Sequence, residues 1–152
     1  MVWFLPLTMG MNGRDGTMLI VEDDPAWRAM YMMEFGDSFR CYEAVDGVQA
    51  LSMVDWVQPD IILLDMRLPR MGGAEFLRAL DRKGVRTPVV VSTGWAEAGE
   101  NARQAGVHVA MKTADLRHVR HAVREAVTAP WGADRRPAAS KPSTADESEW
   151  LD

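Results

Sequence analysis

Three short runs of uninterrupted apolar residues constrain the fold of this chain most strongly. They lie at residues 19–21, 61–64 and 89–91. A strand with one buried face alternates apolar and polar side chains, whereas a strand covered on both faces is apolar throughout. The runs therefore predict parallel strands in a sheet that has helices packed on both of its faces.

Segments of helical pattern separate five predicted strands along the chain. The strands are expected at 18–22, 40–45, 60–65, 88–93 and 107–111. The helices are expected at Pro25–Phe35, Gly47–Val57, Gly73–Arg82 and 115–127, with a short and weak one at 96–105. This alternation predicts an α/β fold, a doubly wound five-stranded parallel sheet built from (βα)5 units.

Apolar residues spaced three and four apart predict the buried faces of two helices. These residues are Ala26, Met30 and Met33 in the first helix and Leu116, Val119, Val123 and Val127 in the last. Asp46 is expected to be the N-cap of the second helix, because an Asp side chain there accepts a hydrogen bond from a first-turn backbone N–H.

The two ends of the chain lack such patterns. The 152 residues fit one domain of ordinary size. We expect 1–17 to be a flexible leader, 18–128 the folded domain and 129–152 a disordered tail, since the tail has few residues that would bury apolar surface. The tail is too short for a DNA-reading effector domain, so we expect the domain to stand alone.

Charge and cysteine content exclude several classes of function. Seventeen Lys and Arg against twenty-two Asp and Glu give a net charge of -5, which argues against nonspecific binding to nucleic acid or anionic membranes. The single cysteine, Cys41, rules out an internal disulfide and favours the cytoplasm. No apolar run approaches the roughly 20 residues that span a bilayer.

The carboxyl ends of four predicted strands carry a carboxylate, hydroxyl or ammonium group. In doubly wound sheets ligands bind at this edge. Helix capping explains each such residue singly but is a poor explanation for all of them together. The residues are Glu22, Asp23 and Asp24 after the first strand, Asp65 in the third, Ser92 and Thr93 in the fourth, and Lys112 after the fifth.

Clustered carboxylates must either take up protons or hold a cation. Oxygen ligands suit Mg²⁺, whereas Zn²⁺ is disfavoured because the pattern includes no His or Cys. A cation beside an Asp, a hydroxyl and a Lys forms a site for a phosphoryl group. Asp65 is the best candidate nucleophile, because it ends the central and most apolar strand.

The motifs that contain these residues resemble those of a bacterial response-regulator receiver domain. The resemblance covers roughly residues 18–127 and is carried by the order and spacing of five segments. These are VEDDP at 21–25, DGVQAL at 46–51, PDIILLDMRLPRMGG at 59–73, PVVVSTG at 88–94 and Lys112.

The resemblance implies a flavodoxin-like fold with strand order 2-1-3-4-5. It implies that Asp65 is the phosphoacceptor and that the phosphoryl donor is a sensor histidine kinase or a histidine phosphotransfer protein. It further implies a signalling domain rather than an enzyme, and it admits a homodimer that forms on phosphorylation. The other implied site residues are Glu22 and Asp23 for Mg²⁺ or Mn²⁺, the main-chain carbonyl of Arg67 for the same ion, and Thr93 and Lys112 for the phosphoryl oxygens.

Three departures from the family pattern concern the expected output face. Thr113 replaces the proline that usually follows the Lys; we expect a trans bond and a shifted Lys backbone, because a cis bond there costs about 2.5–4 kcal/mol. Val109 occupies the place of the usual switch aromatic. The segment from Thr93 to Lys112 is a few residues short. The phosphorylation residues are intact, and the readout is the part these departures affect.

Two further interpretations concern single residues beside the site. Arg67 and Trp95, two places beyond Asp65 and Thr93, are expected to flank the phosphoryl group and shield it from water. Arg67 also argues against a phosphohydrolase, which typically has a second acid at that position.

Alternative functions remain open at this point. The nearest is a receiver-shaped scaffold that is never phosphorylated, which the altered region around Thr113 favours. A dinucleotide carrier would need a Gly-rich turn after the first strand, whereas this chain has Asp23, Asp24 and Pro25 there.

Overall fold

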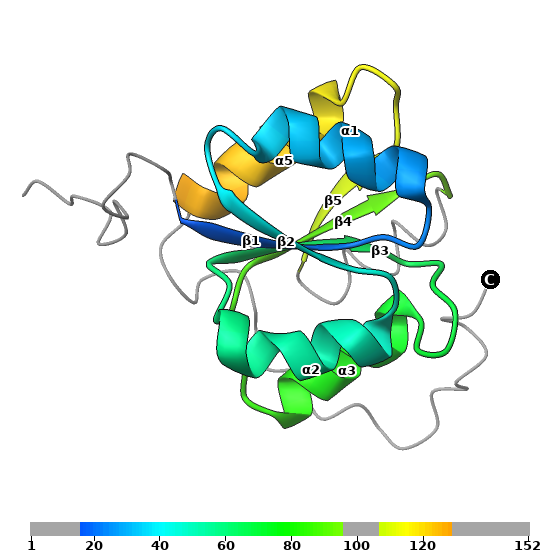
Figure 1. The fold of residues 1–152 in the computed structure, drawn as a ribbon, viewed down its shortest axis with the longest axis vertical. Coiled ribbons are helices and arrows are strands. Elements are labelled where there is room, and N and C mark those ends of the chain that lie inside the picture. The colour runs from blue at the N-terminus through cyan, green and yellow to red at the C-terminus, as the bar shows by residue number, and fades with distance from the viewer. Residues whose placement is uncertain (1–15, 96–106, 129–152) are drawn as a thin grey trace, which may run out of the picture.

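The structure of the chain is a computed structural model that describes residues 16–95 and 107–128. Within these residues five parallel strands form one sheet, in the order β2-β1-β3-β4-β5 (Figure 1). The strands are β1 (Thr17–Val21), β2 (Arg40–Ala44), β3 (Ile61–Asp65), β4 (Val89–Thr93) and β5 (His108–Met111). The helices are α1 (Pro25–Phe35), α2 (Gly47–Val57), α3 (Gly73–Arg82) and α5 (Arg117–Thr128). The expected fold class and strand order are confirmed.

Helices cover both faces of the sheet. The pair α1 and α5 lies on one face and the pair α2 and α3 on the other (Figure 1). Successive strand residues point to opposite faces. In β1, Leu19 and Val21 belong to the core under α2 and α3, whereas Met18 and Ile20 belong to the core under α1 and α5. This two-sided burial is the reason why the central strands are apolar without interruption.

The helix α1 has the predicted bounds but buries a different face. Its buried residues are Tyr31 and Phe35, whereas Met33 is 83% exposed and Ala26 is exposed too. The predicted stripe of Ala26, Met30 and Met33 is therefore wrong, although Met30 is partly buried. Aromatic side chains bury more apolar area than alanine or methionine, so the face with Tyr31 and Phe35 gains more by packing on the sheet.

The helix α5 begins two residues later than predicted. Leu116 has a φ of 55°, a left-handed conformation that does not continue a right-handed helix. Asp115 Oδ1 accepts a hydrogen bond from Arg117 N at 3.2 Å, which satisfies one of the first free amides. Val127 is 41% exposed, in contrast to the prediction. The buried face is completed by small residues instead, and its members are Val119, Ala122, Val123 and Ala126.

The start of α2 is tied to the loop that follows β3. Asp46 is buried, and its Oδ1 accepts a hydrogen bond from Gln49 N at 2.8 Å, which confirms the predicted N-cap. Its Oδ2 accepts a hydrogen bond from Arg70 Nε at 2.7 Å. Arg70 lies in the left-handed region with a φ of 63°. The charged pair therefore links the loop after β3 to the neighbouring helix.

Some predictions concern residues that the structure does not describe. They are the helix expected at 96–105, most of the expected leader and all of the expected tail. Within 16–95 and 107–128, none of the helices combines the length and the apolar character needed to cross a bilayer.

Candidate phosphoryl and metal site

The carboxyl ends of four neighbouring strands bring together the polar residues singled out in the sequence. Glu22 and Asp23 directly follow β1, Asp65 ends β3, Thr93 ends β4 and Lys112 directly follows β5. These strands are parallel and adjacent in the order β1-β3-β4-β5, so the five residues share one edge of the sheet. This is the edge at which doubly wound sheets bind ligands.

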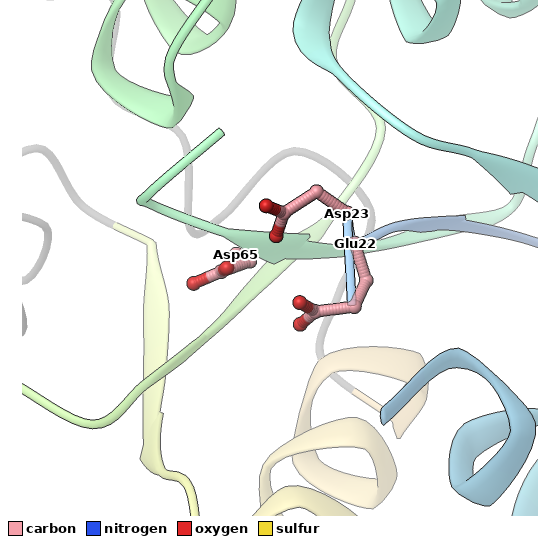
Figure 2. Close-up of side chains that lie close together, drawn as sticks. All are labelled: Glu22, Asp23 and Asp65. Carbon is pink, nitrogen blue, oxygen red and sulfur yellow. The ribbon is translucent and has the colours of Figure 1, made fainter. Parts of the chain in front are cut away.

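Three carboxyl groups at this edge are turned toward a common space (Figure 2). One oxygen each of Glu22, Asp23 and Asp65 lies within 4.8 Å of the other two. Glu22 and Asp65 are buried, whereas Asp23 is exposed. Two like charges about 4 Å apart repel by about 4 kcal/mol at an effective dielectric constant near 20. The cluster therefore needs positive charge beside it.

Lys112 supplies one such charge. Its Nζ lies 2.7 Å from Glu22 Oε2 and 3.5 Å from Asp65 Oδ2. Its backbone N donates a hydrogen bond to Thr93 O at 2.8 Å, which extends the pairing of β4 with β5 by one residue, to Lys112. The Lys112 ammonium thus lies between two of the three carboxylates.

A single ammonium group does not compensate for the buried negative charge. Burial raises the pKa of the Glu22 carboxyl to about 7; the contact with Lys112 opposes this shift, and the charge of Asp65 adds to it. Burial also raises the pKa of Asp65, again opposed by Lys112 and increased by Asp23. The raised pKa values mean that ionised carboxylates are less stable here than in water.

The donor atoms of the cluster fit a hard divalent cation. Glu22 Oε2 is buried and, within the part of the chain that the structure describes, has no hydrogen bond of good geometry, although it forms an ion pair with Lys112 Nζ. The described cluster consists of carboxylates without His or Cys. Such oxygen donors suit Mg²⁺ or Mn²⁺ rather than Zn²⁺. The residues present can therefore hold the predicted metal.

The backbone around the acidic pair is fixed by several hydrogen bonds. Glu22 N donates to Ala44 O at 3.0 Å, and Asp24 N donates to Glu22 Oε1 at 3.2 Å. An Arg28 guanidinium nitrogen donates to Glu22 O at 3.0 Å and to Asp23 O at 2.9 Å. The two acids are thus held at the end of β1 from both sides.

Sequence reasoning missed two residues of α1 that contact the site. One is Arg28, and the other is Trp27, whose ring centroid lies 5.1 Å from Lys112 Nζ. A sequence signal existed for both. Side chains of a helix lean toward its N-terminus, so residues in the first turns of α1 point back to the strand ends from which the helix starts.

Three further predicted residues lie around the acidic cluster. Thr93 is buried, and its Oγ1 accepts a hydrogen bond from Trp95 N at 3.1 Å. Arg67 N donates a long hydrogen bond of 3.4 Å to Asp65 Oδ1. The guanidinium carbon of Arg67 lies 3.9 Å from the ring centroid of Trp95, and both side chains are exposed. The two residues expected to flank the phosphoryl group are therefore stacked on each other.

A glycine allows α3 to approach the end of β3 closely. A Cβ on Gly73 would lie 2.8 Å from Asp65 O and 2.7 Å from Met66 Cα. Both neighbours are backbone atoms that cannot move aside without disturbing the site. Gly73 is therefore required directly behind Asp65.

The departures from the family pattern leave the Lys112 contacts in place. The described residues contain no cis peptide bond, so the predicted trans bond before Thr113 is confirmed. Val109 is partly buried against the core under α2 and α3. Lys112 nevertheless reaches both Glu22 and Asp65.

Comparison with known proteins identifies the family. The sequence profile of the response regulator receiver domain matches residues 18–124 of the chain. The chain belongs to the response-regulator receiver family. Receiver domains are signalling domains of two-component systems, and phosphorylation and Mg²⁺ binding are typical of them. They interact with histidine kinases or phosphotransfer proteins.

Individual proteins are similar to the chain in sequence or in fold. The cell cycle response regulator CtrA from Brucella abortus is 34% identical over 90 residues, which are 59% of this chain and 39% of that protein. The chain therefore matches well under half of the length of this relative. The response regulator TrrA from Thermotoga maritima, solved in complex with Mg²⁺-BeF, has a TM-score of 0.66 at 18% identity and covers 72% of this chain and 97% of that one. The receiver domain of a Luxo repressor protein from Vibrio parahaemolyticus has a TM-score of 0.67 at 22% identity, covering 75% and 90%.

Proposed function

We propose that this receiver domain accepts a phosphoryl group on Asp65 from a phosphohistidine of a sensor histidine kinase or a histidine phosphotransfer protein. The observation that carries the proposal is the position of Lys112, whose Nζ lies 2.7 Å from Glu22 Oε2 and 3.5 Å from Asp65 Oδ2. An ammonium group beside a buried carboxylate and an acidic pair is suited to receive an anion with three charged oxygens.

The reaction is an in-line displacement at phosphorus. An Asp65 carboxylate oxygen forms the new O–P bond while the P–N bond to the donor imidazole breaks, and the electron pair of that bond stays on the imidazole nitrogen. Lys112 pairs with the phosphoryl oxygens, and the Thr93 hydroxyl donates a hydrogen bond to them. Arg28 holds the backbone of the acidic pair in place during the transfer.

The residues that would hold the metal are the Glu22, Asp23 and Asp65 carboxylates and the main-chain carbonyl of Arg67. A bound Mg²⁺ neutralises charge on the acids and on the phosphoryl oxygens. The cluster geometry and the buried Glu22 oxygen support the assignment of the three carboxylates.

Phosphorylation acts by shifting the population of surface conformations. The modified Asp65 carries about -1.5 to -2 charge and new acceptor oxygens, which attract Lys112 and Thr93. A protein partner that prefers the shifted surface then binds more tightly. The stand-alone domain, its cytoplasmic location and a homodimer formed on phosphorylation all stay predictions.

Labelling with a small phosphodonor tests the proposed function. Full-length protein incubated with acetyl phosphate and Mg²⁺ is expected to acquire one base-labile phosphate, and EDTA is expected to prevent it. Borohydride reduction of the acyl phosphate followed by peptide mapping should locate the modification at Asp65. No labelling despite measurable Mg²⁺ binding would favour the scaffold, and steady turnover of phosphate esters would favour a hydrolase.

Arg67 and Trp95 supply a second, separate prediction about the lifetime of the phosphoryl group. Their stacked side chains lie beside Asp65 and Thr93 and would exclude attacking water. A cation–π pair at an exposed site stabilises the stacked arrangement by about 0.5–1 kcal/mol. Arg67→Ala or Trp95→Ala removes this stabilisation and should accelerate hydrolysis about two- to fivefold. The measurement is the decay of labelled protein after removal of the donor. Trp56→Ala, at a Trp that is 63% exposed on α2, is the matched control with no expected change. Slower or unchanged decay in the two site variants would refute the shield.

A further inference from the structure

Lys112 contacts an aromatic ring of α1 as well as the two carboxylates. Its Nζ lies 5.1 Å from the ring centroid of Trp27, within the range of cation–π attraction. The Lys112 side chain is only 13% exposed, and Trp27 is partly buried against the core under α1 and α5. An aromatic ring attracts a poorly hydrated ammonium group more strongly than it attracts an ammonium group that is exposed to water. The ring therefore contributes to the position of the Lys112 ammonium.

A second contact joins the same helix to the strand that carries Thr93. Tyr31 OH and Ser92 Oγ share a buried hydrogen bond of 2.7 Å, and Ser92 is the chain neighbour of Thr93. The rings of Trp27 and Tyr31 are themselves in contact, with centroids 5.9 Å apart. Of these two aromatic residues of α1, Trp27 thus contacts Lys112 itself and Tyr31 contacts the residue that precedes Thr93.

We propose that Trp27 is a positioning residue for Lys112, and that their contact couples the occupancy of the acidic pocket to α1. The inference rests on the proposed function, because it takes the phosphoryl group as the anion that attracts Lys112. The single charge of Lys112 is shared among Glu22, Asp65 and the Trp27 ring. An added anion at Asp65 competes for that charge and changes the environment of the ring.

Fluorine NMR of the full chain tests the coupling directly. The six tryptophans are labelled with 5-fluorotryptophan, and the signals of Trp27, Trp56 and Trp95 are assigned from their Phe variants. Beryllofluoride with Mg²⁺ is the phosphoryl mimic. The chemical shift of the Trp27 signal is expected to change when the protein is saturated with beryllofluoride and Mg²⁺. The chemical shift of Trp56, which lies on α2 and contacts Tyr42, is expected to stay the same.

The same spectra separate the two ways of failing. Beryllofluoride bound to the protein has fluorine signals of its own. If these signals appear while the Trp27 signal does not move, the coupling to α1 is wrong and the proposed function stands. If no bound beryllofluoride appears at saturating Mg²⁺, the proposed function fails, and the coupling fails with it.

A double-mutant cycle tests the positioning role. Trp27→Leu should slow labelling by acetyl phosphate about two- to thirtyfold, the range that corresponds to a cation–π contact, and Trp27→Phe should slow it less. In a Lys112→Met background Trp27→Leu should have no further effect, because the two residues act as one unit. Equal slowing by Trp27→Leu in both backgrounds would show a merely structural role. Trp56→Leu is the control that should leave the rate unchanged.

Discussion

Replacing Asp65 with asparagine is expected to stabilise the metal-free protein while abolishing its phosphorylation. Burial raises the pKa of Asp65, and the charge of Asp23 adds to that shift despite the opposing contact with Lys112. The ionised side chain therefore destabilises the fold near neutral pH, and a neutral amide of the same shape relieves this. Stabilising substitutions at functional sites commonly add about 0.5–2 kcal/mol to the free energy of unfolding, and we expect a gain in that range. The amide cannot act as the nucleophile, so labelling should fall to the level of the blank.

A second buried aspartate provides a matched control with the opposite sign. The pKa of Asp46 is lowered, first by the hydrogen bond from Gln49 N and further by Arg70, so its ionised form is stabilised by folding. Asp46→Asn is therefore expected to lower the free energy of unfolding at neutral pH. The sign of its pH dependence follows from the lowered pKa. The stability from the Asp46 carboxylate is present above its unfolded pKa and is lost as pH falls through its folded pKa.

Urea unfolding in EDTA measures both substitutions under the same conditions. We expect a higher midpoint for Asp65→Asn and a lower one for Asp46→Asn, with unchanged m-values. Saturating Mg²⁺ should stabilise the wild type more than Asp65→Asn, because the variant has lost one carboxylate of the cluster. A destabilised Asp65→Asn variant in EDTA would mean that the Lys112 ion pair outweighs the cost of burying the charge.

The architecture and the acidic cluster could be predicted because each depends on local pattern. Continuous apolar runs identify strands buried on both faces, and parallel strands bring their carboxyl ends to one edge. Once the strands are placed, Glu22, Asp65 and Lys112 must meet there, and the structure brings them together. No packing detail is needed for this step.

The helix faces and the aromatic contacts could not be predicted in the same way. In α1 several faces carry apolar residues, and the choice between Met33 and Tyr31 depends on which side chains fill the space over the sheet. The contact of Trp27 with Lys112 joins residues that are far apart in the chain. The start of α5 depends on the left-handed backbone at Leu116, a conformation that leucine seldom adopts. These features follow from tertiary packing rather than from periodicity.

Neutralising Asp23 is expected to weaken Mg²⁺ binding strongly. A unit charge and a divalent ion about 4 Å apart attract each other by about 2 kcal/mol even in water. Asp23→Asn should therefore raise the Kd for Mg²⁺ at least about thirtyfold. The exposed position of Asp23 leaves the fold intact in the variant, so titration calorimetry measures the effect directly. An unchanged Kd would show that the cation is held elsewhere.

Lys112→Gln provides the test with the opposite charge. The Lys112 ammonium is 2.7 Å from Glu22 Oε2 and repels any cation bound to the acidic cluster. Loss of the Lys112 contact also raises the pKa of Glu22 further, because that contact lowers it. At a pH high enough to ionise Glu22 in both proteins, removal of the ammonium group should therefore strengthen Mg²⁺ binding. Opposite effects of Asp23→Asn and Lys112→Gln on one Kd would demonstrate that net charge at this cluster sets the affinity. Weaker Mg²⁺ binding in Lys112→Gln would instead indicate that the ammonium positions Glu22.

The pH dependence of Mg²⁺ binding follows from the pKa of Glu22, which burial raises to about 7. The carboxyl group must be ionised to bind the metal, so protons compete with Mg²⁺ below that pKa. The Kd of the wild type should rise about tenfold between about pH 8 and pH 6, as expected for the uptake of one proton. Glu22→Gln should bind Mg²⁺ more weakly at the upper pH and show little change with pH, because it has lost the titrating group. A steep pH dependence that persists in Glu22→Gln would assign the proton to Asp65, whose pKa burial also raises.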